Sequence, residues 1–429
     1  MKLFVAAFLL ASPGLSWAQS GPVKLGPTSS AALRRPTPQL VVGMALGEDV
    51  EALLDDFDAA AIETIAAKAM HLVELAPGTS YAQAQVIATS LASDPATVFA
   101  ELNLDVSAPE TPGCDAVPSS VGAQDCTVAF FDGQPTPEKY YDQPAVPLLG
   151  VEAAYAQLIG TPTVVAVIDT GIDPTHPMLA SNLFSLGIDL VDPAGAALDL
   201  GDGIDSDHDG LVDEAVGHGT HVAGTIVLMH PDALVLPIRA LDSDGNGTAF
   251  DVAQGIIEAV LAGADVINLS LGMSGPSAAV QAALELADEA GVDVLASAGN
   301  TGGQVLYPAA YPDAAAVTAV DGLDVKASFA AYGLSVTFAA PGVEIYSTMP
   351  GGAYAWWSGT SMATAVASGA VSLIRALEQD SSLEPDAVDA VEESSAPLDE
   401  LNPGFEGLLG EGRIDLAAAS SSLGEVGED

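Results

Sequence analysis

From Val164 onward, short apolar runs that end in small or polar residues alternate with stretches of helical periodicity. The runs are TVVAVIDTG, ALVLPIRAL, DVINLSLG, DVLASAGN and AAVTAVDG, and the stretches between them include TAFDVAQGIIEAVLAGA and SAAVQAALELADEAG. Continuously apolar strands separated by helices are typical of a mostly parallel sheet with helices on both faces. We therefore predict an α/β fold with a doubly wound sheet. In such folds the site lies at the carboxyl ends of the strands.

A smaller unit is predicted ahead of this sheet, over residues 40–103. QLVVGMAL, HLVELAP and TVFAELNLDV indicate strands, whereas EDVEALLDDFDAAAIETIAAKAM and SYAQAQVIATSLA have helical periodicity. This pattern predicts a small α+β domain of two helices on a sheet. Residues 104–139 are rich in Pro and Gly and indicate a linker or an elaborated loop, which leaves residues 140–429 for the large domain.

The first 18 residues, MKLFVAAFLLASPGLSWA, have the pattern of a signal peptide. Lys2 precedes an apolar run that a Pro-Gly pair interrupts, and SWA is a small-x-small signal for a cut after Ala18. The run is too short to span a membrane, and the later apolar stretches are interrupted by Gly, Asp or Ser. We therefore expect a secreted protein, extracellular or periplasmic, without a membrane anchor. A buried N-terminal helix is the alternative, and residues 19–39 indicate a flexible lead-in.

The chain has two cysteines, Cys114 and Cys126, both within the predicted linker. In an exported chain such a pair suggests one disulfide that closes a short loop, and two free thiols are the alternative. Neither cysteine has a histidine at metal-ligand spacing, so the pair does not predict a zinc site.

Basic residues are scarce, with 10 Lys and Arg against 58 Asp and Glu and a formal net charge of -48. A nucleic-acid partner is excluded on this ground, because the phosphate backbone requires a basic surface. The same charge repels anionic membranes and favours solubility, and we expect a monomer.

Three short motifs place an acid, a histidine and a serine at the ends of predicted strands or the starts of predicted helices. Asp169 follows the strand VVAVI, His218 lies in GHGTHVAGT before an apolar helix, and Ser361 lies in SGTSMATA at another helix start. Each motif alone is commonly a turn or a helix cap. Together they are the components of nucleophilic catalysis, in which a carboxylate orients an imidazole that takes the proton of a serine hydroxyl.

These segments resemble the signatures of the subtilisin-like serine proteases, the subtilases, over roughly residues 140–418. ASAGN, SFAAYG, APGVEIYSTMPGG and GEGRIDLAAA also match in kind and order. The order acid, histidine, serine is the one known for subtilisin. The resemblance implies that Asp169 is the orienting acid, His218 the general base and Ser361 the nucleophile. It also implies an oxyanion hole made by the side chain of Asn300 and the backbone N–H of Ser361.

Two more histidines, His176 and His221, fall in the same motifs, and the family pattern gives them no catalytic part. We expect both to be structural.

The resemblance further implies a polypeptide substrate that is held as an added strand between two extended edges of the enzyme. Leu306 falls at the floor of the family's first specificity pocket, where Gly is frequent. It predicts a shallower pocket that disfavours bulky aromatic residues. The two edges contain Gly245, Asn246 and Gly247 on one side and Ser270, Leu271 and Gly272 on the other.

One position departs from the family pattern, since Ala365 stands where the family usually has Pro. The departure keeps open a narrow-specificity processing protease or a peptide ligase as an alternative to a general endopeptidase. A catalytically silent binding protein on the same scaffold is a third hypothesis, and the intact triad and Asn300 argue against it.

The stretch GDGIDSDHDGLVDEA predicts a calcium site. Oxygen ligands on alternate residues around a glycine turn are the opening of a calcium loop. The final glutamate of an EF-hand would fall at Val216, so this is not a complete EF-hand. A solvated acidic loop is the alternative. The expected ligands are Asp205, Asp207, Asp209, Asp213 and Glu214.

The small domain at residues 40–103 resembles the inhibitory pro-domains of subtilases. The resemblance implies a domain that templates folding, blocks the cleft and is removed by self-cleavage between Asn103 and Tyr140. A permanent accessory domain is the alternative, and the sequence does not fix the bond that is cut.

Overall fold

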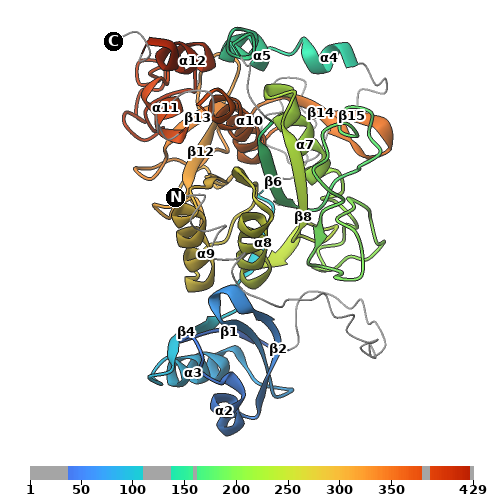
Figure 1. Ribbon diagram of the computed structural model, residues 1–429, viewed down its shortest axis with the longest axis vertical. Coiled ribbons are helices and arrows are strands. Elements are labelled where there is room, and N and C mark those ends of the chain that lie inside the picture. Colours follow the sequence, from blue (N-terminus) through green and yellow to red (C-terminus); the bar gives the residue numbers. More distant parts are fainter. Residues whose placement is uncertain (1–36, 110–136, 158–161, 379–386, 426–429) are drawn as a thin grey trace, which may run out of the picture.

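The computed structural model describes residues 37–109, 137–157, 162–378 and 387–425 (Figure 1). The predicted signal peptide, nearly all of the lead-in, and both cysteines lie outside the described residues.

The centre of the large domain is a seven-stranded sheet in the order β13-β12-β11-β10-β6-β8-β7. Every pair of neighbouring strands in it is parallel, which confirms the predicted doubly wound α/β fold. The strands are β6 (Val164–Asp169), β7 (Ile188–Asp189), β8 (Leu234–Arg239), β10 (Val266–Leu269), β11 (Asp293–Ser297), β12 (Ala315–Val320) and β13 (Phe338–Pro341).

Helices cover both faces of this sheet, which explains why most positions along its strands are apolar. On β6, Val165 and Val167 face a core shared with α7 (His218–Met229) and α10 (Thr360–Glu378). Ala166 and Ile168 face the opposite core, shared with α8 (Ala249–Ala262) and α9 (Ala278–Glu289). The other helices and the hairpin are α4 (Pro137–Tyr141), α5 (Ala145–Leu149), α6 (Val151–Tyr155), α11 (Ala387–Glu393), α12 (Leu416–Glu425), β14 (Ile345–Met349) and β15 (Ala353–Trp357), with a 3-10 turn at Pro350–Gly352.

Among the described residues, α10 is the one helix whose length and composition would allow it to cross a membrane. Of its apolar window, Thr360–Leu377, 89% is buried inside the protein. The helix is apolar because it packs between the sheet and the surrounding helices of the core.

The small domain is a four-stranded antiparallel sheet in the order β2-β3-β1-β4, with α3 packed against it. α3 begins at a capping box in which Ser80 and Gln83 satisfy each other's backbone N–H groups. In Figure 1 the domain lies below α8 and α9. Its elements are β1 (Gln39–Met44), α2 (Val50–Leu54), β2 (Ala59–Ile65), β3 (Met70–Leu75), α3 (Tyr81–Leu91) and β4 (Thr97–Leu102), with 3-10 turns at Asp55–Phe57 and Ala66–Lys68.

The long helix predicted over residues 48–70 was wrong beyond its first turns. The chain leaves the helix at Asp58, whose φ is 49°, and then forms β2 at the edge of the sheet. The Ala-rich and Glu-rich composition favours a helix locally, but pairing with β3 decides the conformation.

The strand predicted for TVFAELNLDV divides in two. β4 ends at Leu102, and a separate strand, β5 (Asp105–Ser107), leaves the small domain and pairs with β9 (Asn246–Thr248) of the large domain. Residues 105–107, at the start of the predicted linker, therefore form a strand on the large domain. The sequence did not indicate this pairing because the partner strand lies far along the chain.

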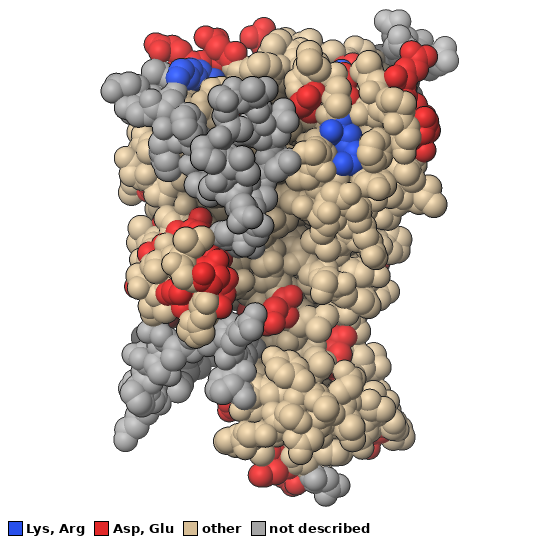
Figure 2. Space-filling model, turned by 180° about the vertical axis from the view of Figure 1, so that it is seen from behind, with Lys and Arg blue, Asp and Glu red and all other residues tan. Residues whose placement is uncertain are grey.

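Each arginine of the large domain forms an ion pair with an aspartate. Arg239 pairs with Asp189 at 3.2 Å, Arg375 with Asp293 at 2.6 Å, and Arg413 with Asp324 at 2.7 Å. Asp and Glu therefore dominate the charged side chains on the face in Figure 2, where Lys and Arg are few.

Candidate active site

Asp169 and His218 form the first contact of the site. Asp169 is the last residue of β6 and His218 the first of α7, and both are fully buried. Oδ1 of Asp169 lies 2.7 Å from Nδ1 of His218 and also accepts the backbone N–H of Thr170. Because the carboxylate accepts, Nδ1 of the imidazole is the protonated nitrogen and Nε2 is left as the proton acceptor.

The close approach of α7 to the end of β6 requires glycine at position 219. A Cβ atom there would lie 2.1 Å from the carbonyl oxygen of Gly171 and 3.1 Å from Oδ1 of Asp169. The glycine after His218 in the motif GHGT is thus the residue that lets the helix carry the imidazole to the carboxylate.

Trp357, the last residue of β15, holds the imidazole from another side. Its ring meets that of His218 edge-on, with centroids 5.3 Å apart and an interplanar angle of 88°. It contacts His221 in the same way at 5.6 Å. No motif in the sequence pointed to Trp357, whose position directly before SGTS was the available signal.

Ser361 lies in the first turn of α10 and is held by the segment that follows β10. Its Oγ donates to the carbonyl oxygen of Ser270 at 3.3 Å, and Oγ of Ser270 donates to the carbonyl oxygen of Ser361 at 3.1 Å. The nucleophile predicted from the sequence therefore meets one of the two predicted substrate edges directly.

The orientation of the Asn300 side chain follows from its contacts. One atom of the Asn300 side-chain amide lies 3.0 Å from the backbone nitrogen of Thr360 and 2.9 Å from its hydroxyl oxygen. Since a backbone N–H can only donate, that atom is Oδ1. Nδ2 is then directed to the carbonyl oxygen of Pro109, 3.3 Å away.

Residues 105–109 of the chain lie across the site as an added strand. Ser107 exchanges both backbone hydrogen bonds with Gly272, at 3.0 and 2.8 Å. On the other side Val106 pairs with Gly247, and the N–H of Ala108 donates to the carbonyl of Gly245 at 2.9 Å. This register is that of a polypeptide held between the edges 245–247 and 270–272, with the Pro109 carbonyl at Asn300.

Leu306 fills the space between two segments of the site. A Cβ atom on Gly272 would lie 2.8 Å from its Cδ1, and a Cβ atom on Gly299 would lie 2.7 Å from it. The Leu306 side chain is half-buried and therefore stands between the 270–272 edge and the segment that ends in Asn300.

The two remaining motif histidines have the contacts of structural side chains. Nε2 of His221 lies 3.1 and 3.2 Å from the carbonyls of Ile345 and Ala355 and so ties α7 to the β14–β15 hairpin. Burial, followed by the charge of His218, lowers the pKa of His221 to about 3, so it is neutral at physiological pH. Nε2 of His176 contacts the carbonyl of Ala353, and burial lowers its pKa.

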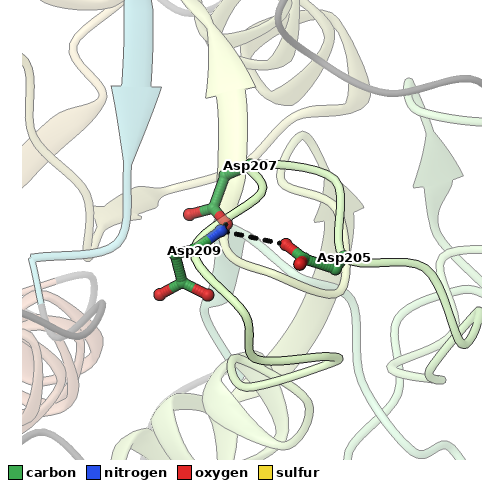
Figure 3. Close-up of side chains that lie close together, drawn as sticks. All are labelled: Asp205, Asp207 and Asp209. Carbon is green, nitrogen blue, oxygen red and sulfur yellow. Dashed lines mark hydrogen bonds between the residues drawn. The ribbon is translucent and has the colours of Figure 1, made fainter.

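The acidic loop brings three of its five predicted ligands together. Asp205, Asp207 and Asp209 each offer a carboxylate oxygen within 4.8 Å of the others (Figure 3). Asp213 instead accepts the backbone N–H groups of Asp202 and Gly203.

Glu214, the fifth predicted ligand, has both carboxylate oxygens buried and without a hydrogen bond from the described residues. Burial, with the neighbouring Asp244 and Asp209, raises its pKa to about 7. Such a carboxylate lacks a cation or a donor.

The acidic loop rests on the turn that leads into the substrate edge. Ser206 donates to the carboxylates of Asp242 and Asp244, at 2.8 and 2.7 Å. The backbone N–H of Asp213 donates to Asp244 as well. The turn continues directly into Gly245, so the loop and the edge share one hydrogen-bonded network.

Residues 160–413, more than half of the chain, match the family described as the subtilase family, peptidase S8. The thermophilic serine proteinase of Bacillus sp. (strain AK1) is 41% identical over 221 residues, covering 49% of this chain and 51% of that protein. Subtilisin Savinase of Lederbergia lenta is 40% identical over 228 residues, covering 51% and 78%. The matched region thus spans about half the length of the first relative.

Among solved structures, fervidolysin from Fervidobacterium pennivorans, described as a keratinolytic enzyme related to subtilisin, has a TM-score of 0.67. The match covers 90% of this chain and 61% of that one, at 24% sequence identity. At this identity the match supports the fold alone.

Proposed function

This chain belongs to the subtilase family, and from this premise we propose that it is a secreted serine endopeptidase made as a self-processed zymogen. The observation that carries the proposal is the strand formed by residues 105–109, whose last carbonyl lies at Asn300, a residue that is bonded to Thr360 next to Ser361. Labelling with a serine-directed fluorophosphonate tests it. We expect one label per chain on Ser361, and a folded chain that takes no label would favour the silent binding protein.

The proposed reaction is acyl transfer through Ser361. Nε2 of His218 takes the hydroxyl proton as Oγ attacks the substrate carbonyl, while Asp169 holds Nδ1–H and stabilises the imidazolium. The developing oxyanion accepts from Nδ2 of Asn300 and the backbone N–H of Ser361. The imidazolium then protonates the leaving amine, and water hydrolyses the acyl-enzyme by the same steps in reverse.

The small domain is proposed to be the inhibitory pro-domain. Support comes from the way it satisfies the N-terminal N–H groups of two helices of the large domain. The carboxylate of Glu101 accepts from the N–H groups of Ala278 and Ala279 at the start of α9. At the start of α8, Ala249 donates to the carbonyl of Leu104 and Phe250 to the side chain of Asn103. Helix N-termini favour such acceptors, and negative charge above all.

We propose that self-cleavage occurs at the bond between Pro109 and Glu110. Pro109 is the residue whose carbonyl reaches the oxyanion donor Asn300, and the register of Ser107 against Gly272 fixes it in that place. Pro109 has no backbone N–H that could donate to the carbonyl of Ser270. That carbonyl accepts a hydrogen bond from the hydroxyl of Ser361. The proposed cut lies within the interval that the sequence left open.

We propose that Leu306 makes the enzyme prefer small residues directly before the cleaved bond. We expect the wild type to cleave peptides after Ala faster than after Phe, because Leu306 occupies the space that an aromatic ring needs. In Leu306→Gly the Phe-to-Ala ratio should rise about tenfold or more, the range that a few methylenes give in a pocket. The measurement is kcat/KM on matched peptide pairs.

Leu323→Gly is the control for that experiment, because Leu323 is 79% exposed and lies in an outer turn. It should leave the ratio unchanged. Equal cleavage after Phe and Ala by the wild type would contradict the assignment of Leu306.

We propose that calcium binds the acidic loop through Asp205, Asp207 and Asp209, with Glu214 as a further ligand. Three clustered carboxylates and a fourth with buried, unpartnered oxygens fit a hard cation, and oxygen donors are what calcium prefers. A bound ion would neutralise their mutual repulsion. Asp213 is not included, because it lies outside the cluster of three carboxylates and accepts the N–H groups of the 202–203 turn.

Removal of calcium should therefore lower the melting temperature. A ligand present at about 100 times its Kd stabilises the folded state by about 2.7 kcal/mol. For a chain of this size that corresponds to roughly 3 °C. The measurement is thermal unfolding of Ser361→Ala, which prevents self-digestion, with calcium and with a chelator.

Asp207→Asn should reduce this calcium-dependent shift. Asp321→Asn is its matched control, because Asp321 also accepts backbone N–H groups in its own turn but lies outside the cluster. A melting temperature that chelation leaves unchanged would remove the calcium site.

A further inference from the structure

Asp199 is a buried acid that no motif of the sequence contains. It is 1% exposed, and its carboxylate accepts hydrogen bonds from two segments of the catalytic site. Oδ1 accepts from the N–H of Gly217 at 2.8 Å and from the hydroxyl of Thr170 at 3.3 Å. Oδ2 accepts from the N–H and the hydroxyl of Thr220, at 3.0 and 2.5 Å.

These partners flank both members of the Asp169–His218 pair. Thr170 directly follows Asp169 at the end of β6, while Gly217 and Thr220 surround His218 in the first turn of α7. The hydroxyl of Thr170 also accepts the N–H of Gly219 at 3.0 Å. Asp199 and Thr170 thus satisfy three N–H groups at the start of this helix.

The backbone of Asp199 is itself fixed to the chain that follows β6. The N–H of Ile172 donates to the carbonyl of Ala197, and the N–H of Asp199 donates to the carbonyl of Ile172. The contact is close enough that a Cβ atom on Gly171 would lie 2.8 Å from the carbonyl oxygen of Ala197. The carboxylate therefore acts from a rigid support.

The cap residue of α7 is Gly217, which has no side chain to accept the N–H groups of the first turn. A carboxylate from elsewhere in the chain takes that part, and a negative charge at a helix N-terminus is favourable. Burial, with the neighbouring Asp169, raises the pKa of Asp199 to about 6, while its hydrogen bonds oppose the shift. The group is thus mainly ionised at neutral pH.

We propose that Asp199 is a positioning residue of the catalytic site. Its carboxylate ties the first turn of the helix that carries His218 to the strand end that carries Asp169, and so holds the imidazole in register with the acid. The inference rests on the proposed protease function. It adds an acid that does not touch the substrate but sets the geometry of His218, which takes the proton, and of Asp169, which orients His218.

The test compares Asp199→Asn with Asp293→Asn in matured enzyme whose active sites are counted with a fluorophosphonate. Asp293 is also a buried acid, bonded to Arg375, but it lies at the start of β11 and far from the strand ends that carry the site. For Asp199→Asn we expect kcat to fall about 10- to 100-fold, the order of loss that misplaced catalytic groups cause, with KM within about threefold. Asp293→Asn should lower the melting temperature and leave kcat within about twofold.

Thr170 provides a second route if Asp199→Asn does not fold. Thr170→Val should lower kcat in the same way, and Thr170→Ser, which keeps the hydroxyl, should restore it. The double variant Asp199→Asn/Thr170→Val should have a kcat no lower than that of the less active single variant, because the two side chains act through one network.

A normal kcat in Asp199→Asn, with only a lower melting temperature, would overturn the proposal. A wild type that neither labels nor self-cleaves would instead contradict the protease function itself, so the two failures are distinguishable.

Discussion

Ser361→Ala is expected to remain full length, with its small domain attached, while the wild type loses everything before Glu110. Removal of the nucleophile of a serine triad costs about a million-fold in kcat, so no cleavage should be measurable. Intact mass and N-terminal sequencing of both proteins, purified in calcium, give the result directly. The mass difference should correspond to a cut after Pro109.

Ser358→Ala is the matched control, because Ser358 lies in the same SGTS segment and its Oγ accepts the N–H of Glu344. It should mature normally. If wild type and Ser361→Ala both stay full length, self-processing is absent, and this result favours the hypothesis of a catalytically silent binding protein. A mature wild type with a different N-terminus would keep the zymogen and reject only the bond assigned to Pro109.

Asn300→Ala is expected to lower kcat about 100- to 1,000-fold while KM changes little. The amide donates where negative charge develops, so its loss removes about 2.7–4 kcal/mol of stabilisation from the transition state alone. Peptide hydrolysis under saturating substrate measures kcat, and a fluorophosphonate titration corrects for the fraction of competent sites.

Asn300→Asp separates donation from a structural role. The carboxylate keeps an acceptor for the N–H and hydroxyl of Thr360 but has no N–H for the substrate carbonyl. We expect it to lose at least as much as Asn300→Ala. An active Asn300→Asp beside an inactive Asn300→Ala would mean that the side chain serves to hold Thr360 and not to stabilise the oxyanion.

The small domain marks where prediction from the sequence was weakest. Its strand β3 and helix α3 were indicated by local periodicity, but β2 was predicted as helix. Composition gave the wrong answer there because β2 is an edge strand with few buried side chains. Its pairing with β3 determines its conformation, and no local pattern encodes that pairing.

The residues of the proposed triad were predictable because each lies where an element begins or ends. Asp169 is the last residue of β6, His218 is the first residue of α7, and Ser361 lies in the first turn of α10, as the motifs indicated. Trp357 and Asp199 were not, since an aromatic residue in a hairpin and an acid in a loop carry no distinguishing spacing. Only their contacts with the pair Asp169 and His218 identify them.

Local patterns along the chain were sufficient to indicate the doubly wound sheet, its helix-covered faces and the residues of the proposed triad. Apolar periodicity and short motifs at element ends are local properties, and a local property is readable along the chain. Only the folded structure shows that residues 105–109 lie across the site, which amide atom of Asn300 meets the Pro109 carbonyl, and that Asp199 caps α7. Each of these depends on hydrogen bonds between segments that are distant in sequence, and such bonds exist only once the fold brings their donors and acceptors together.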